Sequence, residues 1–203
     1  MKHPGIVHTL DYGVMPEIGE YIQMEYVDGR TMSEWLTENP GREARKRVLM
    51  QLLDAMQYLH QKQILHRDLK PGNILITHHG DNVRLIDFGI ADADDYVVLK
   101  QAGGTKGYIA PEVLDGKEAD GRADIYALGK ILSLLFPRRY RMVAAICSRS
   151  KREERYQNVE SVIRAIQRED NILRYLPWVV VLLAMALGLG LMIYGQQRTQ
   201  EQI

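Results

Sequence analysis

Residues 175–195, which read YLPWVVVLLAMALGLGLMIYG, contain no charged side chain. A helix of this length spans about 31 Å at about 1.5 Å per residue, and the hydrocarbon core of a bilayer is roughly 30 Å thick. Tyr175, Trp178 and Tyr194 stand near its two ends, where amphipathic rings settle at lipid headgroups. No polar stripe remains on any face, so the pattern favours a transmembrane helix over a buried core helix. Its position excludes a signal peptide.

The charged residues are balanced, with 26 Lys plus Arg against 26 Asp plus Glu. No net field attracts a polyanion, so we expect no nucleic-acid partner. Cys147 is the one cysteine of the sequence, which rules out an internal disulfide and a CxxC or Cys/His zinc motif. We therefore expect the soluble part in a reducing compartment.

The remaining sequence predicts an α+β domain. Residues 5–13 and 19–27 are rich in β-branched and aromatic residues between turn residues, which indicates a hairpin or meander. The strongest helical pattern covers residues 42–62, where apolar residues recur every three or four positions. Further short strands are expected at 73–77 and 82–87, and further helices at 30–39, 122–136, 140–149 and 158–169, the last capped by Asn158.

Four motifs follow one another in a fixed order. They are HRDLKPGN at residues 66–73, DFG at 87–89, APE at 110–112, and the aspartate that opens DIYALG, Asp124. A single DFG occurs often by chance, whereas the ordered set with these spacings is specific. The sequence resembles the protein kinase superfamily over roughly residues 1–170, and is most similar to the eukaryotic-like, membrane-anchored Ser/Thr kinases of bacteria.

The resemblance implies a protein-kinase-like α+β fold with a mainly helical C-lobe and a remnant of the N-lobe sheet, followed by one C-terminal transmembrane helix. It places the N-lobe remnant and hinge at residues 1–30 and the C-lobe at 31–170. The transmembrane helix follows at 175–195 and a short tail at 196–203. The activity it implies is ATP- and Mg²⁺-dependent phosphorylation of Ser or Thr in proteins.

Within the HRDLKPGN motif, the resemblance implies that Asp68 orients the acceptor hydroxyl, which suits a carboxylate because it is an acceptor-only group. Lys70 stands two residues on, where its ammonium can reach the transferring phosphoryl group. Asn73 and Asp87 supply oxygen ligands, which Mg²⁺ prefers. The catalytic residues implied are thus Asp68, Lys70 and Asn73, and the metal ligands Asn73 and Asp87.

The segment QMEYVDG resembles a kinase gatekeeper and hinge, with Met24 as gatekeeper. The resemblance implies that backbone groups of Glu25 and Val27 pair with the adenine edge. Leu75 is expected to pack beneath the ring. These four residues form the predicted nucleotide-binding set.

A further set of residues is implied to be structural or regulatory: His66, Arg67, Phe88, Gly89, Thr105, Glu112, Asp124 and Arg155. Glu112 and Arg155 are expected to form a buried ion pair. Arg67 requires an anionic partner in the activation segment, where Asp92, Asp94 and Asp95 stand in place of a phosphorylatable residue. The alternative is that these acidic residues form a solvated loop.

Two features of the family are absent from the sequence. No GxGxxG loop occurs anywhere, and the one lysine before Lys46 is Lys2, with no strand ahead of it. We expect the chain to be a fragment of a longer kinase, with the N-lobe clamp on the phosphates missing. The alternative is a truncated product that acts as a membrane-tethered pseudokinase or binding scaffold.

The expected partners are a protein substrate with Ser or Thr, and the membrane. A homodimer through the small residues of the membrane helix, or an N-lobe supplied by another chain, is also considered. Arg164, Arg168 and Arg174 precede the uncharged run and Arg198 follows it. Positive residues stay inside, so we expect a single-pass protein with its kinase domain in the cytoplasm.

Overall fold

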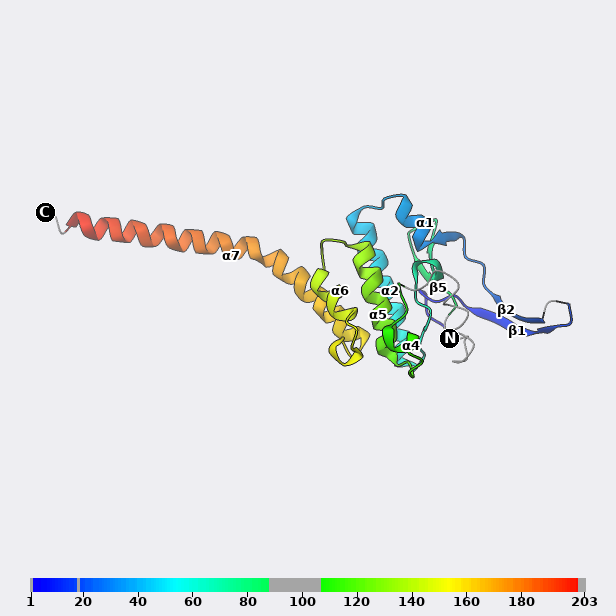
Figure 1. Ribbon diagram of the computed structural model, residues 1–203. Coiled ribbons are helices and arrows are strands. Elements are labelled where there is room, and N and C mark those ends of the chain that lie inside the picture. Colours follow the sequence, from blue (N-terminus) through cyan, green and yellow to red (C-terminus); the bar gives the residue numbers. More distant parts are fainter. Residues whose placement is uncertain (1, 18, 88–106, 201–203) are drawn as a thin grey trace. The chain divides into compact units, whose positions relative to one another are not determined.

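The computed structural model describes residues 2–17, 19–87 and 107–200, without the side chains of 177, 179, 180, 189 and 191–200. The chain divides into two compact units, Met1–Ile163 and Arg164–Ile203. Its elements, drawn in Figure 1, are β1 (Thr9–Met15), β2 (Gly19–Met24), β3 (Gly29–Thr31), α1 (Met32–Thr37), α2 (Arg42–Gln61), η1 (Pro71–Asn73), β4 (Ile74–Thr77), β5 (Val83–Leu85), α4 (Pro111–Leu114), α5 (Gly121–Leu135), α6 (Arg141–Cys147), η2 (Arg152–Glu154) and α7 (Val159–Gln200).

The predicted hairpin is confirmed, because β1 and β2 pair antiparallel with Tyr12 opposite Ile22. These two strands form a sheet of their own. Strand β1 carries apolar side chains that remain largely exposed: Leu10 is 56% exposed, Tyr12 80% and Val14 73%. A two-stranded sheet buries too little surface to be stable by itself in water, so the hairpin depends on its neighbours.

A second sheet has the order β3-β4-β5, with both pairings antiparallel. The short strand β3 is not predicted from the sequence. Gly29 makes its pairing feasible, because a Cβ at this position would lie 2.6 Å from the carbonyl oxygen of Ile76. The N-terminal segment joins the edge of β5, where Val7 N–H donates to the Leu85 carbonyl at 3.0 Å and Leu85 N–H to the Gly5 carbonyl at 2.8 Å.

The helical core is built on α2 and α5, which lie side by side in Figure 1. The apolar stripe predicted for α2 is confirmed, since its four defining residues are all fully buried: Val48, Leu52, Met56 and Leu59. Asp120 caps α5 by accepting a hydrogen bond from the Arg122 N–H. Burial of the apolar stripe of α2 is the main contribution to the stability of this helix, since each large aliphatic side chain contributes roughly 1.5–3 kcal/mol.

Helix α7 begins as predicted, because the Asn158 side chain accepts a hydrogen bond from the Ser161 N–H at 2.8 Å. The prediction of two helices with a short connection between them is wrong, since α7 runs without a break from Val159 to Gln200. Pro177 lies inside it. Among the described helices, α7 is the one long and apolar enough to cross a membrane, with a mean hydropathy of 1.6 over an 18-residue window within the candidate span Val159–Gly188.

Candidate active site

The loop that carries HRDLKPGN is anchored by Asp124, which lies in the first turn of α5. Its carboxylate accepts hydrogen bonds from the backbone N–H groups of His66 and Arg67, each at 2.9 Å. Arg67 has a φ of +64°, a conformation that costs free energy for a residue with a side chain. The hydrogen bond to Asp124 offsets part of that cost and fixes the loop immediately before Asp68.

Asp124 also pairs with His60, whose Nε2 lies 2.9 Å from Oδ2 of the carboxylate. Burial acts to raise the pKa of Asp124, but hydrogen bonds and charge from His60 and His66 outweigh it, and the pKa lies below its ordinary value. His60 was missed from the sequence. It stands at the end of the helix pattern of residues 42–62, where a polar residue is ordinarily solvated, and only the fold brings it to a residue 64 positions away.

Asp68 is bound by two side chains from its own loop. Lys70 Nζ donates to Asp68 Oδ2 at 2.9 Å. Asn73 Nδ2 donates to the same oxygen at 3.0 Å and to the Asp68 backbone carbonyl at 2.9 Å. The structure therefore brings the three predicted catalytic residues together around one carboxylate.

Asn73 also connects this loop to the segment that carries Asp87. The backbone carbonyl of Asn73 accepts a hydrogen bond from the Ile86 N–H at 3.2 Å. Ile86 directly follows β5, which pairs antiparallel with β4. Asp87 follows with a φ of +57° and an exposed side chain. The two predicted metal ligands thus stand on adjoining segments, one buried and one facing solvent.

The donor set of Asn73 and Asp87 suits a hard cation. Since the Asn73 amide nitrogen is engaged by Asp68, the amide oxygen is the end of the side chain left for a metal ion. The Asp87 carboxylate supplies a second oxygen, and Mg²⁺ favours a site of one or two protein oxygens completed by water and phosphate. In the described ranges no group of three or more His, Cys, Asp or Glu residues forms a metal cluster.

The segment predicted to be the hinge begins at Met24, the last residue of β2. The Glu25 N–H donates to the His8 carbonyl at 2.9 Å, so the Glu25 carbonyl is the backbone group left for a ligand. The Glu25 carboxylate accepts a hydrogen bond from the His8 N–H at 3.1 Å, and its Oε1 lies 3.7 Å from Nη1 of Arg84. The hinge is thereby tied on both sides before any ligand binds.

A shallow hollow of about 260 Å³ lies beside the hinge, lined by Glu25, Tyr26, Val27, Asp28, Thr77, His79 and Arg84. Two of the predicted nucleotide-binding residues, Glu25 and Val27, line it. Met24 and Leu75 are half-buried and are not among its lining residues. Arg84 was not predicted, and its alternation with buried Val83 and Leu85 on β5 is the signal that could have placed it on this face.

The predicted pair of Glu112 and Arg155 is present and buried. Arg155 donates from Nη1 and Nη2 to the two Glu112 oxygens at 2.6 and 2.7 Å. Its remaining donors reach the backbone carbonyls of three residues, Arg149, Arg122 and Ser150. The guanidinium also lies 5.0 Å from the centre of the Tyr126 ring. All of these contacts tie the APE segment to the C-terminal helices.

Phe88, Gly89 and Thr105 lie outside the described residues, as do Asp92, Asp94 and Asp95. Their proposed roles therefore remain predictions.

Comparison with known proteins agrees with this arrangement. The family model for the protein kinase domain matches residues 1–177. The chain belongs to the protein kinase family. Serine/threonine-protein kinase PrkC of Bacillus subtilis (strain 168) is 40% identical over 137 residues, which is 65% of this chain and 21% of PrkC. Pkn1 of Myxococcus xanthus is 42% identical over 136 residues, covering 64% of this chain and 20% of Pkn1.

The solved kinase domain of Mycobacterium tuberculosis PknI gives a TM-score of 0.67 at 25% identity, covering 83% of this chain and 73% of that domain. The protein kinase fold with mixed helices and sheet is thus confirmed. The chain spans only about a fifth of the length of the first curated relatives it matches, 21% and 20%.

Proposed function

We propose that the chain transfers the terminal phosphoryl group of ATP to Ser or Thr hydroxyls of proteins. The observation that carries the proposal is the position of Asn73. It holds the Asp68 carboxylate with its side chain and the segment before Asp87 with its backbone. The proposed general base and the two proposed metal ligands would thereby act side by side, as phosphoryl transfer requires.

Asp68 is proposed to accept a hydrogen bond from the substrate hydroxyl and to take its proton as the oxygen attacks. Lys70 and Asn73 restrain the carboxylate by donating to Oδ2, and their hydrogen bonds fix its orientation toward the hydroxyl. Lys70 is also long enough to offer its ammonium to the transferring group. Such positioning is the main contribution of a protein to this reaction.

Asn73 and Asp87 would hold Mg²⁺ through the amide oxygen and the carboxylate. When bound, the ion neutralises charge on the phosphate oxygens. The Glu25 carbonyl and Val27 N–H would pair with the adenine edge, with Met24 behind it and Leu75 beneath the ring.

The domain assignment is part of the proposal: N-lobe remnant and hinge at 1–30, C-lobe at 31–170, membrane helix at 175–195 and tail at 196–203. Residues 1–203 contain no Gly-rich loop and no strand lysine. We therefore propose that the clamp on the α- and β-phosphates comes from polypeptide beyond these residues, joined to them or on another chain. Without it, ATP would keep its hinge contacts while its phosphates remain mobile and hydrated.

The test is a radiolabelled ATP assay with a protein substrate on three proteins. They are residues 1–203, the same residues fused to the N-lobe of a homologous kinase, and the fusion with Asp68→Asn. We expect a low rate from the first, a rate higher by orders of magnitude from the second, and loss of that gain in the third. Normal turnover by residues 1–203 alone would contradict the proposed need for an added lobe. A fusion no faster than its Asp68→Asn variant would contradict the catalytic assignment.

The second candidate is a membrane-tethered pseudokinase that binds a partner without transferring phosphate. The exposed apolar side chains of β1 favour it, since contiguous apolar surface often marks an interaction site. Measured ATP affinity and autophosphorylation separate the two, because a pure binding module needs neither.

The membrane location is also proposed. Helix α7 has the length and hydropathy to span a bilayer, and three arginines precede its uncharged part: Arg164, Arg168 and Arg174. Positive residues on the inner side would keep the kinase unit in the cytoplasm, where ATP is found.

A further inference from the structure

The continuity of α7 fixes the distance between its polar part and its uncharged part. Because the helix is unbroken from Val159 to Gln200, each residue before Tyr175 lies about 1.5 Å farther from the start of the uncharged run. Asn171 is therefore about 6 Å, Arg168 about 10 Å and Arg164 about 16 Å from Tyr175 along the axis. The headgroup layer of a bilayer is about 5–7 Å deep on each side, so an arginine side chain at position 168 is long enough to reach it when it extends toward the bilayer.

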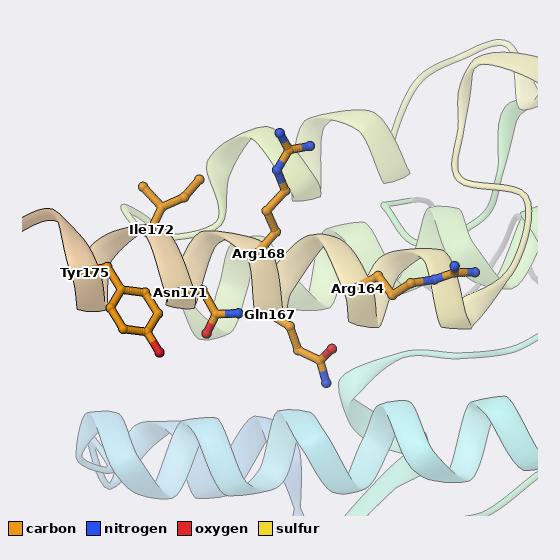
Figure 2. Close-up of a pocket in the computed structure, with 6 residues that line it drawn as sticks. All are labelled: Arg164, Gln167, Arg168, Asn171, Ile172 and Tyr175. Carbon is orange, nitrogen blue, oxygen red and sulfur yellow. The ribbon is translucent and has the colours of Figure 1, made fainter. Parts of the chain in front are cut away.

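Six residues of this part share one exposed face and line a shallow hollow of about 460 Å³: Arg164, Gln167, Arg168, Asn171, Ile172 and Tyr175. Figure 2 shows their side chains following one another along the helix. All six are exposed. We call this set the arginine face.

The acidic residues of the same segment, Glu169 and Asp170, lie outside the arginine face, each about 60° beyond one of its edges. At about 100° per residue, Arg164, Asn171 and Tyr175 lie within about 60° of Arg168 around the axis. Glu169 and Asp170 are turned from Arg168 by about 100° and 200°. Glu160 precedes Arg164 by one turn and is about 22 Å from Tyr175, beyond the headgroup layer.

We propose that the arginine face binds, through Arg168, the phosphate headgroup of an anionic phospholipid in the leaflet from which α7 enters the bilayer. The inference rests on the proposed membrane location of α7. A guanidinium binds phosphate oxygens through paired N–H groups. The amides of Gln167 and Asn171 can hydrogen bond to glycerol and ester oxygens, and Ile172 and Tyr175 offer apolar contact at the boundary.

The experiment uses the full chain in vesicles that contain a photoactivatable phosphatidylglycerol or, separately, a photoactivatable phosphatidylcholine. Labelled residues are mapped by mass spectrometry. We expect phosphatidylglycerol to label the arginine face in preference to phosphatidylcholine. Arg168→Gln should reduce this labelling about fivefold, from the electrostatic contribution of one arginine near an anionic surface. Arg47→Gln, on exposed α2 surface, removes the same charge elsewhere and should leave labelling unchanged.

Other results would overturn the proposal. Equal labelling by the two lipids, or labelling centred on Glu169 and Asp170, would show that the arginine face has no preference for anionic headgroups. Suppression of labelling by millimolar soluble glycerol phosphate would show a site for free phosphate instead of a bilayer lipid. Removal of the chain from vesicles by an alkaline wash would refute the membrane span itself, and is scored separately.

Discussion

Arg155 donates hydrogen bonds from both terminal nitrogens to the Glu112 carboxylate, at 2.6 and 2.7 Å. The Arg155 side chain is 0% exposed and that of Glu112 is 8% exposed. Removing one partner of such a pair leaves the other charge buried, at a cost of about 3–5 kcal/mol. Arg155→Ala should therefore lower the free energy of unfolding of the kinase unit by about this amount.

Arg152→Ala is the matched control. Arg152 lies 3.4 Å from Asp120 and is far more exposed, at 36%, so its loss should cost at most about 1 kcal/mol. Thermal or denaturant unfolding of the two variants in detergent gives the comparison. Equal melting temperatures would refute the structural role of the buried pair.

The ionisation of Asp124 makes the free energy of unfolding depend on pH. Its pKa lies below the ordinary value because hydrogen bonds and charge from His60 and His66 outweigh the opposing effect of burial. A carboxyl whose pKa is lower in the folded state stabilises the fold fully above its unfolded pKa, about 3.9. That stability is lost as the pH falls through the folded pKa. The free energy of unfolding, measured between pH 6 and pH 2, should decline as the pH falls, and the decline should be shallower in Asp124→Asn.

An identical decline in wild type and Asp124→Asn would assign the acid sensitivity to other carboxylates. Asn at this position keeps one acceptor oxygen for the loop N–H groups but cannot be ionised. The variant is therefore expected to be less stable at neutral pH, with the difference narrowing in acid.

Local patterns predicted the fold where a regular period or cap was present. The apolar period of Val48, Leu52 and Met56 and the cap at Asn158 each depend on neighbours in sequence. The strand β3 was missed because three residues, Gly29–Thr31, are too few to show alternation. The unbroken course of α7 was missed because residues 158–169 and 175–195 carry two different patterns, and the few residues between them, 170–174, show no sign that the helix continues.

The contacts of the site also divide into those that the sequence predicted and those that it did not. Asp68, Lys70 and Asn73 lie within one loop, so their contact follows from short spacing. The pairing of His60 with Asp124 joins residues 64 positions apart, and no local pattern reports it. The contact of Arg84 with Glu25 likewise depends on how β5 meets the hinge. Contacts of this kind follow from the tertiary fold and not from any one segment.

Cys147 should be inert in the folded protein. Burial raises the pKa of its thiol to about 12, and the thiolate is the reactive form. Maleimide or iodoacetamide at pH 8 should label the native chain slowly and the denatured chain rapidly. Cys147 is the single cysteine, so labelling reports this site directly, and Cys147→Ser provides the blank. Fast labelling under native conditions would mean that α6 opens readily.

The orientation of α7 gives a separate prediction. If the kinase unit is cytoplasmic, a tag placed after Ile203 should be removed by protease added to intact cells. A tag placed before Met1 should stay protected and serves as the control. The reverse pattern would place the arginines preceding the uncharged run on the outer side, against the distribution of positive charge.

Asn73 provides the sharpest test of the proposed chemistry, because its side chain has two ends with separate tasks. The nitrogen donates to Asp68, and the oxygen is proposed to bind Mg²⁺. Asn73→Ala in the fusion with a complete N-lobe removes both. We expect the Mg²⁺ concentration for half-maximal rate to rise about 10–100-fold, as is usual when metal-site support is lost. Turnover at saturating Mg²⁺ should also fall, because Asp68 loses a restraint.

Asn73→Asp separates the two tasks. It keeps an oxygen for the metal but replaces the donor with a second carboxylate beside Asp68. Its Mg²⁺ requirement should therefore stay near that of wild type, while turnover falls as far as in Asn73→Ala or farther. The measurement is phosphate transfer titrated with Mg²⁺ at fixed ATP, with folding checked by circular dichroism. If Asn73→Asp shifts the Mg²⁺ requirement as much as Asn73→Ala does, the oxygen is not a metal ligand. If Asn73→Ala retains full turnover at high Mg²⁺, the hydrogen bond to Asp68 does not position the base.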